Sequence, residues 1–450
     1  MATPQQYAEY LNIIANPDSI RKIAKLEFLN PDGTVAFTVD GNEHKDTTGF
    51  RHSKAWLQSG TLNVSLQNGM RRKASIEFAN LDREFDFNVN HLWFGQQVRL
   101  SMGVKLKDGT DYYIPQGVFY ISSPSLDWKP NSRKATYQLV DKWAYLDGSL
   151  FGKLRDTYEV AIGSNIFGAM QSMLQISKYT LNANVIAPIQ DQIDNITPIF
   201  TDYYNNLPNT TVNGQEYARN VVPYDLRTDY GQTYANVLLS LNNLISGWIG
   251  YDATGALTVE PSESVIDNDN KQISGDAYKP IQWDFTTASK TFLGLTETAQ
   301  MSEVYNEVIV VGEALKDGEN APYAIGFNYD ANSPTSIDRI GAKVYAENDS
   351  NYVTDDQCGD LARFRLRRAS ALQKQVTITS TQMFHLHENN LITVKRTDKE
   401  GSPTERHLIQ SFSIPIGQAG TMSITATSVQ DFPEITVVTG KEIEQQEANQ

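Results

Sequence analysis

Three histidines have the type and spacing that most directly suggest metal chemistry. His385 and His387 stand two positions apart in the stretch MFHLHEN, and His407 follows later in the chain. On a β-strand, residues two apart share one face, and three imidazoles are a ligand set that suits zinc. The alternative is that these are solvated side chains at the polar end of a strand. Because no carboxylate converges with them in the sequence, we favour the solvated interpretation.

Two pairs of aspartates have a spacing that could serve acid–base hydrolysis. Asp225 and Asp229 are four apart, and Asp267 and Asp269 are two apart in an acidic loop. A glycosidase needs two carboxyl groups held roughly 5–9 Å apart in a rigid cleft. Acidic pairs are frequent in a chain with 53 Asp and Glu residues, so we interpret both pairs as solvated acids.

The sequence shows no assembled nucleophile and no phosphate-binding loop. It lacks the glycine-lysine phosphate loop, a strand-linked G-x-G-x-x-G, the G-x-S-x-G elbow and H-E-x-x-H. The single cysteine, Cys358, falls at an apolar position of an expected helix, where a small core residue is more usual than a nucleophile. We therefore predict no enzymatic activity, no cofactor and no metal.

Basic residues gather in two places. Arg71-Arg72-Lys73 follows the turn Asn68-Gly69, and four arginines lie close together on an expected helix: Arg363, Arg365, Arg367 and Arg368. Either cluster could be a solvated face or, for the helix, a complement to the dipole of its last turn. On an acidic protein, concentrated arginine also suits ion pairs between subunits. We take the four helix arginines as candidate inter-subunit residues.

The composition is that of an acidic globular protein. Its 450 residues allow two to four domains, and 38 Lys and Arg against 53 Asp and Glu give a net charge of −15. This balance argues against a general nucleic-acid binder, and one cysteine excludes an internal disulfide framework. The N-terminus has no basic and apolar leader, and no apolar run is long enough to span a bilayer. We expect synthesis in a reducing cytosol and no membrane anchor.

Short alternating strands are expected at both ends of the chain, with helices between them. About eight strands precede Trp143, among them two hairpins closed by Asn-Pro-Asp-Gly and by Asn68-Gly69. Apolar residues then recur at helical spacing from Ile162 to Leu174 and over Tyr234–Ile245, which a strand hairpin follows. Strands resume near residue 281, and helical spacing returns over Thr354–Leu372.

These patterns predict a mainly β fold with an α+β middle. Two antiparallel β-barrel-like domains flank or enclose a mixed helical domain. The expected boundaries are a helical arm at 1–22, a first barrel at 23–147, an α+β domain at 148–285, a second barrel at 286–433 with its helix at 354–372, and a polar tail at 434–450.

Three stretches resemble the central tail-hub, or baseplate-hub, proteins of bacteriophages and related contractile injection systems. Residues 60–85, 94–104 and 114–148 are similar to the strand set of the first hub barrel, and residues 233–261 to the helix and hairpin of the middle domain. Residues 304–313, 355–396 and 406–428 look like the second barrel with its helix. Relatives commonly carry a proline and a glycine where this chain has His387-Glu388-Asn389-Asn390.

The resemblance implies a structural role. Three copies would form a ring in which two similar barrels per chain create a pseudo-sixfold surface, joining a sixfold tail tube to a threefold tip. Implied partners are the tail tube protein, distal tail or baseplate proteins, the tape measure protein and a tip or spike protein. DNA would pass transiently through the bore, and an acidic surface discourages phosphate binding. The implied location is the virion tail, after synthesis in the host cytoplasm.

Two alternatives remain open at this point. A tail-associated peptidoglycan hydrolase or peptidase would need a further domain with a nucleophile or metal set, but the resemblance reaches to about residue 430. A receptor-binding tail protein could use its 22 tyrosines and 6 tryptophans to line sugar sites, but these are spread along the chain.

Overall fold

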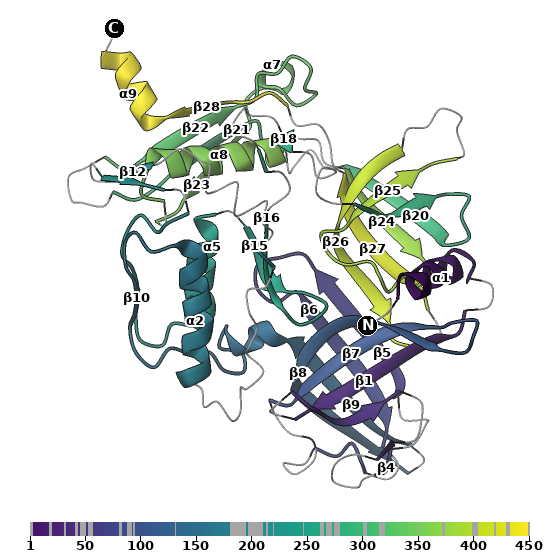
Figure 1. Cartoon of the computed structure of the whole chain (residues 1–450). Coiled ribbons are helices and arrows are strands. Elements are labelled where there is room, and N and C mark those ends of the chain that lie inside the picture. Colours follow the sequence, from purple (N-terminus) through teal and green to yellow (C-terminus); the bar gives the residue numbers. More distant parts are fainter. Residues whose placement is uncertain are drawn as a thin grey trace.

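The computed structural model describes most of the chain. The described residues are 3–17, 20–30, 33–40, 44–45, 51–52, 57–80, 83–87, 92, 95–130, 132–180, 195–196, 210–212, 215–218, 220–245, 247–261, 265–266, 272–273, 280–299, 304–314, 320–350, 352–370, 374–397, 404–417, 420–428 and 433–448. Strands predominate among them (Figure 1), which confirms the prediction of a mainly β chain. None of the helices in these ranges is both long and apolar enough to cross a membrane.

The N-terminal strands form the first half of one large sheet. Their order is β2 (Val35–Val39), β1 (Lys22–Leu29), β7 (Gln97–Lys105), β8 (Asp111–Lys129), β9 (Ser132–Asp141), β6 (Arg72–Ala79) and β5 (Leu57–Ser65). All these neighbours pair antiparallel. Side chains alternate across the strands, so β6 buries Ala74, Ile76 and Phe78 on one face.

The C-terminal strands continue the same sheet. The path runs from β5 to β26 (Thr404–Pro415), β27 (Met422–Ser428), β24 (Lys374–Ser380) and β20 (Phe292–Ala299), while β25 (Leu391–Lys395) joins β26 to β19 (Ile281–Thr286). A bulge at Ile409–Ser411 bends β26. Its first part pairs with β25, and its last part pairs with β5, opposing Ile414 to Leu62. The two halves are therefore one hydrogen-bonded sheet, and the described strands do not close into a barrel.

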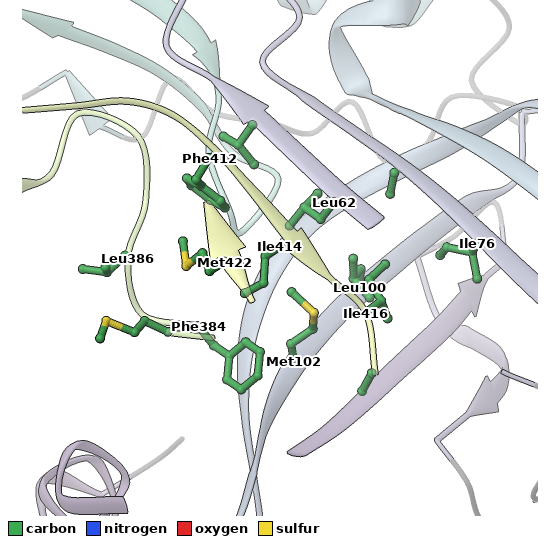
Figure 2. Packing of buried hydrophobic residues seen from close by; sticks show 14 of the residues in the cluster. Leu62, Ile76, Leu100, Met102, Phe384, Leu386, Phe412, Ile414, Ile416 and Met422 are labelled. Atoms are coloured by element: carbon green, nitrogen blue, oxygen red, sulfur yellow. The ribbon is translucent and has the colours of Figure 1, made fainter. Parts of the chain in front are cut away.

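One hydrophobic core lies between these halves. Figure 2 shows Leu62 and Met102 from the first half beside Phe384, Ile414 and Met422 from the second. All five are at most 2% exposed. A sequence read strand by strand does not reveal which strands of distant segments pair, so the prediction of two separate barrels missed this shared core.

The expected N-terminal arm is a helix docked on the large sheet. Helix α1 (Pro4–Ala15) begins at the N-cap Thr3, whose side chain accepts from the backbone N–H of Gln6. Tyr10 and Ile14, four apart, are fully buried in the shared core. The backbone N–H of Lys107 also donates to Glu9 at 2.9 Å. Helix α1 thus contacts both halves.

A second core occupies the middle of the chain. It contains the 3-10 helix η2 (Lys142–Tyr145), helices α2 (Ile166–Thr180) and α5 (Tyr234–Asn243), paired strands β10 (Tyr158–Val160) and β14 (Leu226–Thr228), and the hairpin of β15 (Gly247–Tyr251) and β16 (Leu257–Pro261). The further short strands are β3 (His44–Lys45), β4 (Arg51–His52), β11 (Asn195–Ile196), β12 (Thr210–Val212), β13 (Gln215–Tyr217), β17 (Val265–Ile266) and β18 (Gln272–Ile273). The predicted helix–hairpin unit is present as α5, β15 and β16.

The arginine-rich helix packs on a separate four-stranded sheet and forms a third core with it. Strands β23 (Val344–Asn348), β21 (Glu307–Val311), β22 (Tyr323–Phe327) and β28 (Thr436–Thr439) form a four-stranded sheet, on which α8 (Asp355–Ser370) packs. The short helix α7 (Ile337–Ile340) lies in the connection from β22 to β23. The helix expected beside the second barrel lies here instead, and the expected polar tail contains β28 and α9 (Gly440–Ala448). Alternation identifies β21 and β22 as strands but not the sheet that they join.

Candidate functional site

A buried ion pair joins the two halves of the large sheet. Arg72, at the start of β6, pairs through Nη2 with Glu388 Oε2 in the irregular segment 381–390. The two side chains are 1% and 4% exposed. Arg72 also donates through Nη1 to the carbonyl oxygen of Gln116 at 3.0 Å. Arg71 lies beside it, with Nη1 4.0 Å from Glu388 Oε1. A buried pair is stable only when each charge stays matched, so this contact fixes the relative position of both halves.

A buried carboxylate fixes the backbone beside this pair. Asp141 Oδ2 accepts from the backbone N–H groups of Arg71 at 2.7 Å and Arg72 at 2.9 Å, and its Oδ1 accepts from Trp143 at 3.0 Å. Burial raises the pKa of Asp141 to about 6, although these three N–H donors and the Arg72 charge oppose the shift. Asp141 also caps η2, so one side chain connects β6, the end of β9 and the middle core.

The hairpin of β15 and β16 in the middle core contacts the same place. Gly69 donates its backbone N–H to the carbonyl oxygen of Ile249 at 2.9 Å, and Ile249 donates to Asn68 Oδ1 at 2.9 Å. Gly250 lies against the Arg71 side chain, so closely that a Cβ atom on it would overlap the guanidinium Nε. The Lys142 ammonium donates to the carbonyl oxygen of Gly255 at 2.8 Å. Three parts of the chain therefore converge on Arg71, Arg72 and Asp141.

Helix α1 closes this junction from the other side. The Phe384 backbone N–H donates to the Tyr10 hydroxyl at 3.0 Å, and that hydroxyl lies 3.0 Å from His385 Nδ1. The Tyr10 hydroxyl has one proton and two acceptor lone pairs, so it can accept from Phe384 and still either donate to Nδ1 or accept from it, according to the tautomer of His385. Gln116 Nε2 donates to the Phe384 carbonyl oxygen at 2.7 Å. We call Arg71, Arg72, Asp141, Glu388 and the Tyr10–His385 contact the polar junction.

Solved structures of tail proteins share the fold of this chain. No known family model and no curated protein matches the sequence. A tail protein from Neisseria meningitidis MC58 aligns over 91% of this chain and 97% of its own, with a TM-score of 0.54 and 9% identity. The 43 kDa tail protein of prophage MuSo2 from Shewanella oneidensis aligns over 91% and 98%, with a TM-score of 0.53 and 12% identity. The chain has the fold of these tail proteins.

Within this tail-protein fold, the three histidines are not arranged as a metal site. The prediction that they are solvated strand residues was wrong, because His385 and His387 lie outside the strands and burial affects all three side chains. His385 lies in the irregular segment 381–390 and is 6% exposed, and His407 on β26 is 0% exposed. Burial lowers the pKa of His385 and His407 to about 4 and that of His387 to about 3. The described residues contain no group of three potential ligands placed to hold a metal.

Asp225 and Cys358, two further chemical candidates, have structural roles. Asp225 Oδ1 accepts from the backbone N–H of Ile162 at 2.9 Å, and the Asp229 carbonyl oxygen accepts from Gln232 in a turn. Asp267 and Asp269 lie outside the described residues. Cys358 is fully buried on α8, as predicted, and burial raises the pKa of its thiol to about 12.

Arg365, one of the four candidate arginines, pairs with an acid of the same chain. Arg365 Nε and Nη2 donate to Glu347 on β23 at 2.8 and 2.9 Å. Arg363 and Arg367 are partly buried, and the Arg368 side chain lies outside the described residues. An inter-subunit role for these arginines stays a prediction.

The cluster Arg71-Arg72-Lys73 was expected on a solvated or inter-subunit surface, but Arg71 and Arg72 are buried. One signal was available. Arg72 stands in the same alternating phase as Ala74, Ile76 and Phe78, which the strand buries. A charged residue in the inward phase of a strand requires a buried partner, but the sequence does not identify Glu388 as that partner.

Proposed function

We propose that this chain is the structural hub of a phage tail tip or baseplate. The observation that carries the proposal is the fold, which nearly the whole chain shares with two tail proteins. The polar junction supports it, because it fixes the two halves of the large sheet and the middle core in one body. The role is mechanical and non-enzymatic, and the chain acts in the virion tail.

Three copies form a ring in this proposal. Each chain contributes the two barrel-like halves of its large sheet. Three chains therefore present six similar units to a sixfold tail tube, and the three copies of the ring match a threefold tip. The β5–β26 pairing supports this, because a continuous hydrogen-bonded sheet resists shear between the halves. The halves then keep a fixed relative orientation while the ring carries load.

The partners follow from this position. The ring contacts the tail tube protein on one side and the distal tail or baseplate proteins and a tip or spike protein on the other, and the tape measure protein ends at its bore. DNA crosses the bore transiently. The net charge of −15 favours passage without binding, because like charges repel phosphate.

The purified chain tests the stoichiometry. We expect a mass of three copies by light scattering, against 50.4 kDa for one chain, and no clearing of a host cell-wall suspension. A single copy at every concentration and salt would contradict the ring. Cell-wall clearing that His385→Gln or Asp225→Asn abolishes would favour the hydrolase instead.

A further inference from the structure

The four-stranded sheet has two apolar faces, but α8 covers only one of them. The covered face contributes Val308, Val310 and Ala324 to the third core, and all three are 0% exposed. Residues one position away point to the opposite face. Figure 1 shows α8 lying along the strands. We call the opposite face the outer sheet face.

The register of the strands shows that the outer sheet face is continuous. Ile309 is opposite Ile325 on one side and Ala346 on the other, and Ile325 is opposite Val438. The next row places Phe327 and Val344 on either side of Glu307. The apolar side chains that form this face are Ile309, Val311, Ile325, Phe327, Val344 and Val438.

Each of these side chains is partly accessible, in contrast to the covered face. Val344 is 48% exposed, and Tyr329, whose ring stacks on Phe327 at 5.9 Å between centroids, is 54% exposed. Exposed apolar surface that is contiguous over several strands marks an interaction site more often than scattered apolar residues do. A sheet with two apolar faces is stable when both are covered.

The size and charge of the face indicate what covers it. Four strands about 4.8 Å apart and five residues long make a surface roughly 15–20 Å across. That is far fewer residues than the roughly 20–30 that a stable subunit interface uses on each side, but it matches a helix of about 12 residues, roughly 18 Å long. Glu307 is the one residue charged at neutral pH that the register places on this face among the described strands.

We propose that the outer sheet face binds an amphipathic helix of another protein, with an apolar stripe on the sheet and a Lys or Arg beside Glu307. The helix mirrors α8, which covers the opposite face. A second copy of the same face is the less suitable occupant, because it would bring another Glu307 and no cation. This inference does not depend on the hub proposal, since one chain carries the whole site.

Cysteine footprinting with defined peptides tests the site on the full chain. The natural Cys358 is buried and its thiol pKa is raised, so an introduced cysteine at an exposed site reacts alone. Val344→Cys reports on the outer sheet face, and Tyr230→Cys, at a position 72% exposed in the middle of the chain, is the matched control. The probes are two synthetic 14-residue helical peptides that share one leucine stripe and carry either lysine or glutamate elsewhere.

We expect the lysine peptide to slow maleimide labelling of Val344→Cys at least about fivefold and to leave Tyr230→Cys unchanged. The glutamate peptide should bind several-fold more weakly, and Glu307→Lys should reverse this order. The proposal is overturned if neither peptide protects Val344→Cys, if both cysteines are protected equally, or if Glu307→Lys leaves the order unchanged. Protection that rises with protein concentration and no peptide would assign the face to a second copy and also overturn it.

Discussion

Arg72 and Glu388 are 316 positions apart in sequence and form a buried ion pair in the structure. One lies at the start of β6 in the first half of the large sheet, and the other lies in the segment before β25 in the second half. Each half therefore contributes one charged side chain to this buried place, where neither charge would be stable without the other. The ion pair stabilises the fold only when the two halves take the relative position that brings both charges together.

Removing one partner should cost more than removing both. We expect Arg72→Met or Glu388→Gln to lower the free energy of unfolding by about 3–5 kcal/mol, because each leaves an uncompensated buried charge or polar group. The double variant Arg72→Met with Glu388→Leu should recover part of that loss, but not all of it, because Glu388 also lies 4.0 Å from the buried Arg71 guanidinium. Denaturant unfolding of Arg72→Met, Glu388→Leu and the double variant measures the coupling. Arg99→Met is the control, because Arg99 is 40% exposed in its pair with Glu27 and should cost at most about 1 kcal/mol. Equal losses in the control and in the Arg72 variant would contradict a special role for the junction.

The close approach of Gly250 to Arg71 makes a second prediction. Gly250→Ala places a methyl group against the Arg71 guanidinium and the Gly69 carbonyl oxygen, and we expect it to destabilise the fold by about 1–3 kcal/mol. Gly294→Ala on β20 is the matched change, because its nearest neighbour would be Thr379 Cβ at 3.9 Å. The difference between the two thermal midpoints is the measurement. A neutral Gly250→Ala variant would show that Arg71 moves freely.

Acid should lower the free energy of unfolding of this chain. The pKa values of His385 and His407 are lowered from 6.5 to about 4, and that of His387 to about 3. Between these values and 6.5, the unfolded chain binds more protons than the folded chain, so stability falls as the pH falls. Asp141, with its pKa raised to about 6, acts oppositely between about pH 4 and 6, because the folded state holds its proton longer.

Three histidines outweigh one aspartate, so the net effect is a loss of stability from about pH 6.5 to 4. Denaturant midpoints at pH 7.5, 6 and 5 should fall in that order. His385→Gln should flatten the fall, because glutamine does not titrate but can still form a hydrogen bond with Tyr10. A midpoint that rises on acidification, or an unchanged slope in the variant, would contradict this description.

The arginine helix can be tested against the in-chain pair. Arg363→Glu and Arg368→Glu should weaken assembly of the ring and make it more sensitive to salt, because charges at an interface rim act mainly on rate and salt dependence. Arg365→Gln should instead lower the stability of the single chain by at most about 1 kcal/mol, since its pair with Glu347 is partly exposed. Sedimentation at low and high salt separates these effects. Unaltered assembly of both glutamate variants would return Arg363 and Arg368 to an ordinary solvated surface.

The sequence predicts the local elements of this protein better than their arrangement. Alternation and turn residues locate β1, β2, β15 and β16, and helical spacing locates α5 and α8, because these signals lie within a few consecutive residues. The β5–β26 pairing joins residues such as Val64 and Phe412, and no local pattern specifies such a partner. The shared core and the place of α8 were missed for that reason.

The candidate site was predictable only in part. Cys358 was expected in the core and lies there, because an apolar helix position carries that information by itself. The histidines were expected in solvent, because MFHLHEN reads as polar, but Tyr10 from the far end of the chain encloses His385. Burial produced by a distant segment leaves no trace in the neighbouring residues.

Electron cryomicroscopy of the assembled protein bound to tail tube tests the hub proposal most directly. The account predicts a ring of three copies around an open bore, in which the two halves of each large sheet alternate as six similar units and meet the end of the tube. A particle that holds one copy, or a ring whose copies do not place both halves around the bore, would contradict it.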